Sequence, residues 1–135
     1  MTHKIIQPDG WHPASGYANG VLSVDGTLYI GGQIGWTAAQ VFETDDFIGQ
    51  MEQALKNIVA IIAAAGGQPT DITRLTWFIL DKQEYLSRLP EVGQTYRRIL
   101  GRHFPAMSML VVKDLIEDKA LLEIEATAVI TSGSD

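Results

Sequence analysis

The chain has 135 residues, of which 46% are hydrophobic and 19% are charged, and its formal net charge at pH 7 is −6. This composition is typical of one globular domain with a buried core, and it argues against intrinsic disorder. The acidic balance argues against nucleic acid as a partner, because phosphate binding requires a basic surface, and the absence of cysteine excludes disulfides and thiolate chemistry.

The N-terminal part begins with a predicted β-hairpin. In the stretch VLSVDGTLYIGG at 21–32, the pair Asp25–Gly26 stands between two runs of alternating apolar residues, which is a strong hairpin signal. The pair Gly31–Gly32 then interrupts the second strand. Glycine inside a strand marks a bulge or the close approach of a ligand or another backbone.

The clearest predicted helix covers 45–65. Thr44 is the expected N-cap, and Asp45 and Asp46 suit the positive end of the helix dipole. Gly66–Gly67 supplies the stop. Apolar residues recur at spacings of three and four and form one stripe that faces a core: Phe47, Met51, Leu55, Ile58 and Ile62.

The second half of the chain predicts a strand in DITRLTWFIL at 71–80, a helix over 83–100 that Pro90 divides, and two strands near 106–113 and 120–130. The order is therefore β-β-α-β-α-β-β. Such an order predicts an α+β fold in which two helices pack on one face of a mixed sheet.

The strand expected at 106–113 carries apolar residues on both faces. Two helices can cover only one face of a sheet, so the second apolar face needs another cover, and another subunit is the expected one. We assign Met107, Met109 and Val111 to this uncovered face.

No linker or repeat divides the chain, so we expect one domain over 1–135, with an N-terminal extension at 1–14 and a flexible tail at 131–135. No apolar run reaches the length of a signal peptide or a membrane span. We therefore expect a cytoplasmic protein with no membrane partner.

Common catalytic signatures are missing: there is no GxSxG, no phosphate-binding loop and no dinucleotide fingerprint. His3, His12 and His103 do not have metal-ligand spacing, so no metal site is expected. Glu123 and Glu125 share one face of a strand and could do acid–base work, although exposed carboxylates on a strand are the commoner explanation.

One basic cluster stands at the end of the second helix. It consists of Arg97, Arg98, Arg102 and His103. We interpret it as a solvated helix end that complements the helix dipole.

Six stretches, in order and covering nearly the whole chain, resemble the YjgF/RidA family, which is also described as reactive-intermediate deaminases or L-PSP endoribonucleases. They are GYANGV at 16–21, YIGGQIG at 29–35, ALKNIVAIIAAAGG at 54–67, ITRLTWFILD at 72–81, FPAMSMLVV at 104–112 and LEIEATAVI at 122–130.

The resemblance implies a fold similar to bacterial chorismate mutase, in which three subunits pack their sheets into a central barrel with the helices outside. It implies a homotrimer with three small-molecule clefts between subunits. Active members of the family hydrolyse enamines and imines, such as 2-aminoacrylate, to the keto acid and ammonia, and they use no cofactor and no metal. An arginine anchors the substrate carboxylate, and a glutamate on the final strand positions or activates water.

The chain departs from the family pattern at three positions. Met107 stands where the anchoring arginine stands, Gly31 stands in place of a frequent hydroxyl residue, and Gly93 stands in place of an asparagine. A charge-assisted arginine–carboxylate contact contributes roughly 1.5–3 kcal/mol per hydrogen bond. Its loss should lower the affinity for a small 2-imino acid by about one to three orders of magnitude, so a bulkier, less acidic or aromatic ligand is expected.

The resemblance also assigns the retained site residues. Glu123 and Tyr17 are expected to be catalytic. Trp36 can be interpreted either as a pocket residue or as a packing residue at a strand end. The expected substrate-binding residues are Gly31, Gly32, Gln33, Trp36, Met107 and Ser108.

Three functions are open at this point. The first is a deaminase-type hydrolase with altered substrate choice. The second is a non-catalytic trimer that binds a metabolite or a partner protein. An endoribonuclease is the third, and the acidic composition counts against it.

Overall fold

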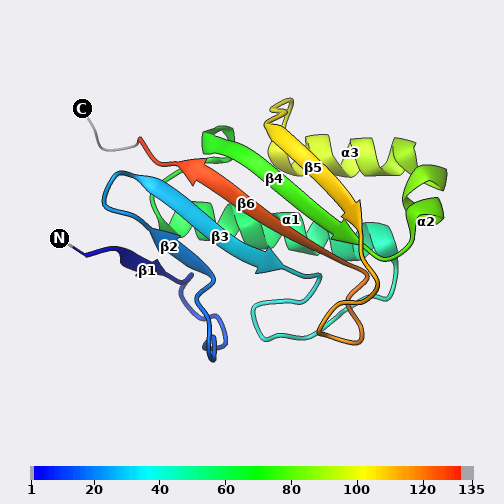
Figure 1. Ribbon diagram of the computed structural model, residues 1–135, viewed down its shortest axis with the longest axis horizontal. Helices are drawn as coiled ribbons and strands as arrows, with labels where there is room; N and C mark the ends of the chain where they lie inside the picture. Colours follow the sequence, from blue (N-terminus) through cyan, green and yellow to red (C-terminus); the bar gives the residue numbers. More distant parts are fainter. Residues whose placement is uncertain (1, 132–135) are drawn as a thin grey trace.

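The computed structural model describes residues 2–131 and places them in two layers, a six-stranded mixed sheet and helices that pack behind it (Figure 1). The predicted α+β class is confirmed, and the tail expected at 131–135 lies outside the described residues except for Thr131. No helix in this range combines the length and apolar character that a membrane span requires. The six strands are β1 Lys4–Ile6, β2 Gly20–Leu22, β3 Thr27–Gln33, β4 Ile72–Ile79, β5 Ala106–Val111 and β6 Leu122–Val129. The α-helices are α1 Phe47–Ala64, α2 Lys82–Ser87 and α3 Leu89–Leu100, and a short 3-10 helix, η1, covers Pro69–Asp71.

The strand order in the sheet is β1-β2-β3-β6-β4-β5. All neighbours pair antiparallel except β4 and β5, which are parallel because α2 and α3 connect them. The strand β6 therefore lies in the middle of the sheet, and β1 and β5 form its edges (Figure 1). The predicted order of elements is confirmed. The structure contains one further strand, β1, which lies in the N-terminal segment 1–14 that we expected to be an extension.

The helix α1 packs across the back of the sheet and buries the stripe predicted for it against the sheet. All members of this stripe are at most 4% exposed. The expected N-cap at Thr44 is wrong. The side chain of Asp46 caps α1 by accepting a hydrogen bond from the Gly49 N–H at 3.2 Å. The hydroxyl of Thr44 instead accepts from the Asp46 N–H at 3.0 Å, and so shapes the turn before the helix.

The predicted division of the second helix is confirmed, since α2 and α3 meet at Arg88, and Pro90 lies in the first turn of α3. Arg88 forms ion pairs with Asp46 at 2.6 Å, Glu91 at 2.9 Å and Glu84 at 3.2 Å. Hydrogen bonds to these carboxylates raise the pKa of Arg88 above its ordinary value. The ion pair between Arg88 and Asp46 therefore connects the junction of α2 and α3 to the start of α1.

The face of β5 that the helices cover is the opposite of the one we expected. In β4, Trp77 is buried on the helix side, and the parallel register places Met109 beside it. The uncovered face assigned to Met107, Met109 and Val111 is therefore wrong. Because both alternations of this strand are apolar, only its register with β4 decides which side faces the helices. The open face instead carries Arg74, Thr76, Phe78, Ser108, Leu110, Glu123 and Glu125.

Candidate functional site

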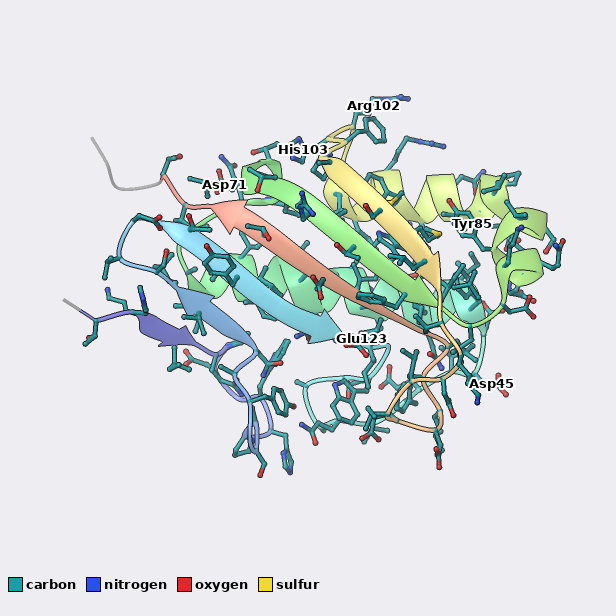
Figure 2. The ribbon with its side chains drawn as sticks, viewed as in Figure 1. Asp45, Asp71, Tyr85, Arg102, His103 and Glu123 are labelled. Atoms are coloured by element: carbon teal, nitrogen blue, oxygen red, sulfur yellow. The ribbon has the colours of Figure 1, made fainter. Side chains whose placement is uncertain are left out.

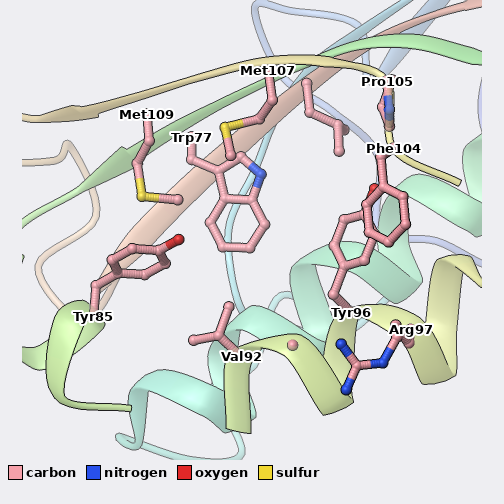
Figure 3. A pocket seen from close by; sticks show the side chains of 11 residues that line it. Trp77, Tyr85, Val92, Tyr96, Arg97, Phe104, Pro105, Met107 and Met109 are labelled. Carbon is pink, nitrogen blue, oxygen red and sulfur yellow. The ribbon is translucent and has the colours of Figure 1, made fainter. Parts of the chain in front are cut away.

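A cavity of about 280 Å³ lies between the edge strand β5 and the helix α3 (Figure 3). Met107 and Met109 project into it from β5, and Val92 lies on the helix side. Its lining is mostly apolar and aromatic, which is typical of small-molecule pockets. The full set is Leu75, Trp77, Tyr85, Val92, Gly93, Tyr96, Arg97, Phe104, Pro105, Met107 and Met109.

One end of this pocket is held rigidly. The Tyr96 hydroxyl donates a hydrogen bond to the backbone carbonyl of His103 at 2.6 Å, and the ring of Tyr96 stacks on Phe104 with centroids 5.6 Å apart. The Nε2 atom of His103 lies 2.7 Å from the carbonyl oxygen of Ile72. Burial raises the pKa of Tyr96. The phenol therefore stays neutral and serves as a fixed wall.

The floor of the pocket contains an unusual donor. Trp77 is 2% exposed. Within residues 2–131, its Nε1 is the only buried side-chain nitrogen or oxygen that has no hydrogen-bond partner. Buried polar groups are normally hydrogen-bonded, and an unpaired one calls for an explanation.

The opposite face of the sheet holds Glu123. Its side chain is half-buried, and its carboxylate lies against Gly32, where a Cβ would overlap it. Burial first, and then the neighbouring charge of Glu125, raise the pKa of Glu123 above the ordinary value. A second hollow of about 280 Å³ adjoins this carboxylate, and it is lined by Phe78, Val112, Asp114, Leu115, Glu123 and Glu125.

The glycine pair beside Glu123 forms the predicted irregularity of β3, because the register of β3 and β6 shifts between Ile30 and Gln33. The Gly31 N–H donates to the carbonyl of Asn19 at 2.9 Å. Gln33 is buried, and its amide donates to the side chain of Asn19 at 3.1 Å and to the Gly31 carbonyl at 3.2 Å. The bulge thereby anchors the loop that carries the exposed Tyr17.

The remaining expected site residues lie elsewhere. Trp36 forms a β-bridge with Phe42, their rings lie 5.9 Å apart, and both line a third hollow. Ser108 is exposed on the open face, opposite to Met107. Residues 2–131 contain no cluster of three His, Asp or Glu side chains that could hold a metal ion.

The structure therefore divides the expected site between the two faces of the sheet. Met107 belongs to the pocket under α3, whereas Glu123 and the glycine bulge belong to the open face (Figure 2 labels Glu123). Most of the residues that line this pocket were not predicted from the sequence, and Trp77, Tyr85 and Arg97 are among them. Gly93 and Arg97 are four residues apart and therefore lie on one side of a helix, but no pattern in the chain indicates that this side faces a pocket.

The comparisons with known proteins match the chain almost end to end. The family model described as Endoribonuclease L-PSP matches residues 9–130. A RutC family protein of Haemophilus influenzae is 30% identical over 129 residues, which are 96% of this chain and 98% of that protein. The human protein named 2-iminobutanoate/2-iminopropanoate deaminase is 32% identical over 114 residues, which are 84% of this chain and 79% of that protein. The solved structure of Escherichia coli TdcF with bound serine has a TM-score of 0.78 at 30% identity and covers 93% of this chain and 98% of its own.

Proposed function

This chain belongs to the Endoribonuclease L-PSP family, the YjgF/RidA family whose motifs it carries, and from this premise we propose that it hydrolyses imines or enamines of small metabolites to keto compounds and ammonia. The observation that carries the proposal is the carboxylate of Glu123. It is half-buried at the glycine bulge of β3, and its pKa is raised. A carboxyl group whose pKa lies closer to neutrality transfers protons more effectively at physiological pH.

The proposed reaction requires one proton-transfer group and one water molecule. Glu123 accepts a proton from water as the water oxygen bonds to the carbon of the protonated imine. It then returns that proton to the amine nitrogen. The C–N bond breaks, its electron pair leaves with the nitrogen, and the released ammonia takes up the hydroxyl proton, which yields the keto product and an ammonium ion. Tyr17 and the Gly31 and Gly32 backbone are proposed to orient the substrate.

We further propose that the complete cleft forms between two chains of a homotrimer. Within one chain the sheet separates Glu123 from the Met107 pocket, so a ligand that touches both needs the open face of one subunit beside the pocket of the next. Exposed apolar side chains on the open face support such an interface. They are Tyr29, Leu110 and Val129.

The position of Met107 supports altered substrate recognition. Its thioether lines an apolar pocket and offers no charge to a carboxylate. We therefore propose that a small enamine such as 2-aminoacrylate, which has no group to fill this apolar pocket, is turned over slowly, and that an imine with a larger apolar group is preferred. The neighbouring carboxylates of Asp114, Glu123 and Glu125 repel a phosphate backbone, which counts against a nuclease.

Coupled assays test the proposal. Serine dehydratase would generate 2-aminoacrylate, and L-amino acid oxidase acting on L-phenylalanine would generate an aromatic imine. We expect the protein to accelerate keto-acid release from the aromatic imine more than from 2-aminoacrylate. Glu123→Gln should abolish both accelerations, and Glu125→Gln serves as the matched control. A folded protein that accelerates neither reaction would instead indicate a non-catalytic binding module.

A further inference from the structure

We infer that the pocket between β5 and α3 binds a carboxylate with an apolar body, and that Arg97 on α3 anchors its negative end in place of an arginine on β5. That this ligand is the substrate of the hydrolysis proposed above rests on the proposed function. The binding itself rests on the pocket and its three unused donors.

The apolar part of the pocket suits a flat or branched hydrocarbon group. Trp77 lies between the two methionines and Val92, and the stacked Tyr96 and Phe104 close one end (Figure 3). Methionine is unbranched and polarisable, so it adapts to the outline of a ligand and makes favourable contacts with aromatic rings.

Within residues 2–131, three polar side-chain groups that line this pocket have no partner, and each of them can donate a hydrogen bond. They are the buried N–H of Trp77, the hydroxyl of Tyr85 and the guanidinium of Arg97. No carboxylate lines the pocket, and within residues 2–131 no ion pair holds Arg97. Two of these groups, the indole N–H and the charged guanidinium, can only donate, and the hydroxyl can also donate, so the site complements an acceptor-rich anion.

Gly93 explains why Arg97 can face the pocket. The two residues are one helical turn apart, and a Cβ at position 93 would lie 3.0 Å from one terminal nitrogen of Arg97. The guanidinium therefore lies over the bare backbone of α3 at the pocket rim, across from Met107 (Figure 3). A Cβ at position 93 would crowd the guanidinium and force it to shift.

The buried donor of Trp77 gives the ligand a second fixed point. In Figure 3 the indole nitrogen lies on the side of the ring that faces Tyr96, and the Met107 side chain lies beside the indole. Met107 is 51% exposed and can rotate away. A ligand acceptor such as a keto oxygen would then satisfy the indole N–H while the carboxylate pairs with Arg97.

Calorimetric titration with 3-phenylpropanoate as the probe tests this assignment, with the uncharged 3-phenylpropanamide and the short propanoate as comparison compounds. We expect 3-phenylpropanoate to bind best. Arg97→Gln should weaken its binding about 10- to 100-fold, as expected for a lost charge-assisted contact. Arg102→Gln removes the same charge just after α3, at a position that does not line the pocket, and should leave binding unchanged.

Trp77→Phe tests the second donor, because it keeps an aromatic ring and removes only the N–H group and part of the ring. We expect binding of phenylpyruvate, which has a keto oxygen, to weaken more than that of 3-phenylpropanoate. A thermal melt of each variant confirms that the fold is intact. Equal binding to the wild type and to Arg97→Gln, or no binding of 3-phenylpropanoate to the wild type, would overturn the inference.

The same titrations separate this inference from the proposed function. Glu123→Gln should lose turnover and still bind 3-phenylpropanoate, because Glu123 lies on the other face of the chain. Turnover of 2-aminoacrylate without any binding of 3-phenylpropanoate would overturn the inference and leave the proposed function standing. Arg97-dependent binding without turnover of any imine would support the inference and overturn the proposed function.

Discussion

Leu110 and Val111 are consecutive residues of β5 that are almost equally exposed, at 47% and 53%, on opposite faces of the sheet. If the open face packs against other subunits, Leu110→Asp should dissociate the trimer, because a charge in an apolar interface is strongly unfavourable. Val111→Asp is the matched control, and it should leave the assembly intact. Light scattering should give about three times the 14.8 kDa of one chain for the wild type and for Val111→Asp only.

A monomeric wild type would contradict the proposed cleft directly. Dissociation by Val111→Asp with no effect of Leu110→Asp would instead mean that the interface uses the helix side of β5.

The raised pKa of Glu123 predicts a pH-dependent stability. Because the folded state holds this proton more tightly than the unfolded state, its stabilising effect is present at low pH and is lost as the pH rises through the raised pKa. Glu123→Gln should therefore raise the melting temperature at pH 7 and have little effect near pH 4. The rate of imine hydrolysis by Glu123→Gln should be about 100-fold or more below that of the wild type.

Thermal melts and rates at both pH values check this prediction. Glu125→Gln relieves only the smaller cause of the shift, so its gain in stability should be smaller. A melting temperature of Glu123→Gln below that of the wild type at pH 7 would contradict the assignment.

Gly93→Ala should have opposite effects on stability and binding. Alanine is more favourable than glycine inside a helix by roughly 0.5–1 kcal/mol, so the melting temperature should rise. The added Cβ should shift the guanidinium of Arg97 from its present position and weaken binding of 3-phenylpropanoate. A variant that is more stable and binds equally well would show that Arg97 does not depend on the bare backbone.

Gln50 is fully buried and should be one of the most sensitive positions for stability. Its amide donates to the carbonyls of Thr44 at 3.1 Å and Lys119 at 2.9 Å, and its oxygen accepts from the Leu121 N–H at 2.8 Å. Gln50→Leu leaves these backbone groups unpaired and should cost about 2–4 kcal/mol in the free energy of unfolding.

Urea unfolding measures this cost. The control is Gln53→Leu on the same helix, where one side-chain hydrogen bond to Asn57 is lost. It should cost about 1 kcal/mol or less. Equal losses for the two variants would mean that the link from α1 to the loop before β6 contributes little.

The sequence predicted those parts of the fold that depend on local pattern. The stripe of α1, the turn at Asp25–Gly26 and the break at Pro90 are each encoded by residues close together in the chain, and all three are confirmed. The short strand β1 was not predicted, because three residues carry too little periodicity. The N-cap was misplaced because Thr44 and Asp46 are both good caps, and only the backbone geometry distinguishes them.

The site was less predictable because its residues meet only through tertiary contacts. The family motifs named Glu123 and Met107 as expected site residues, but they could not show that the sheet separates the two in one chain. Trp77 was part of an ordinary strand pattern, and its unpaired N–H depends on what surrounds it. From the sequence, Arg97 was interpreted as part of a solvated helix end. The structure places it in the last turn of α3, where it also lines the pocket.

The central position of β6 has a consequence for how the chain folds. Among the strands of residues 2–131, β6 comes last in the sequence, yet it lies between β3 and β4 and alone joins the two halves of the sheet. Until β6 has been synthesised, β3 and β4 both present unpaired edges that can associate with other chains. Because strands paired over such long separations form slowly, we expect folding to be completed late, with a partly formed sheet that is prone to aggregation during synthesis.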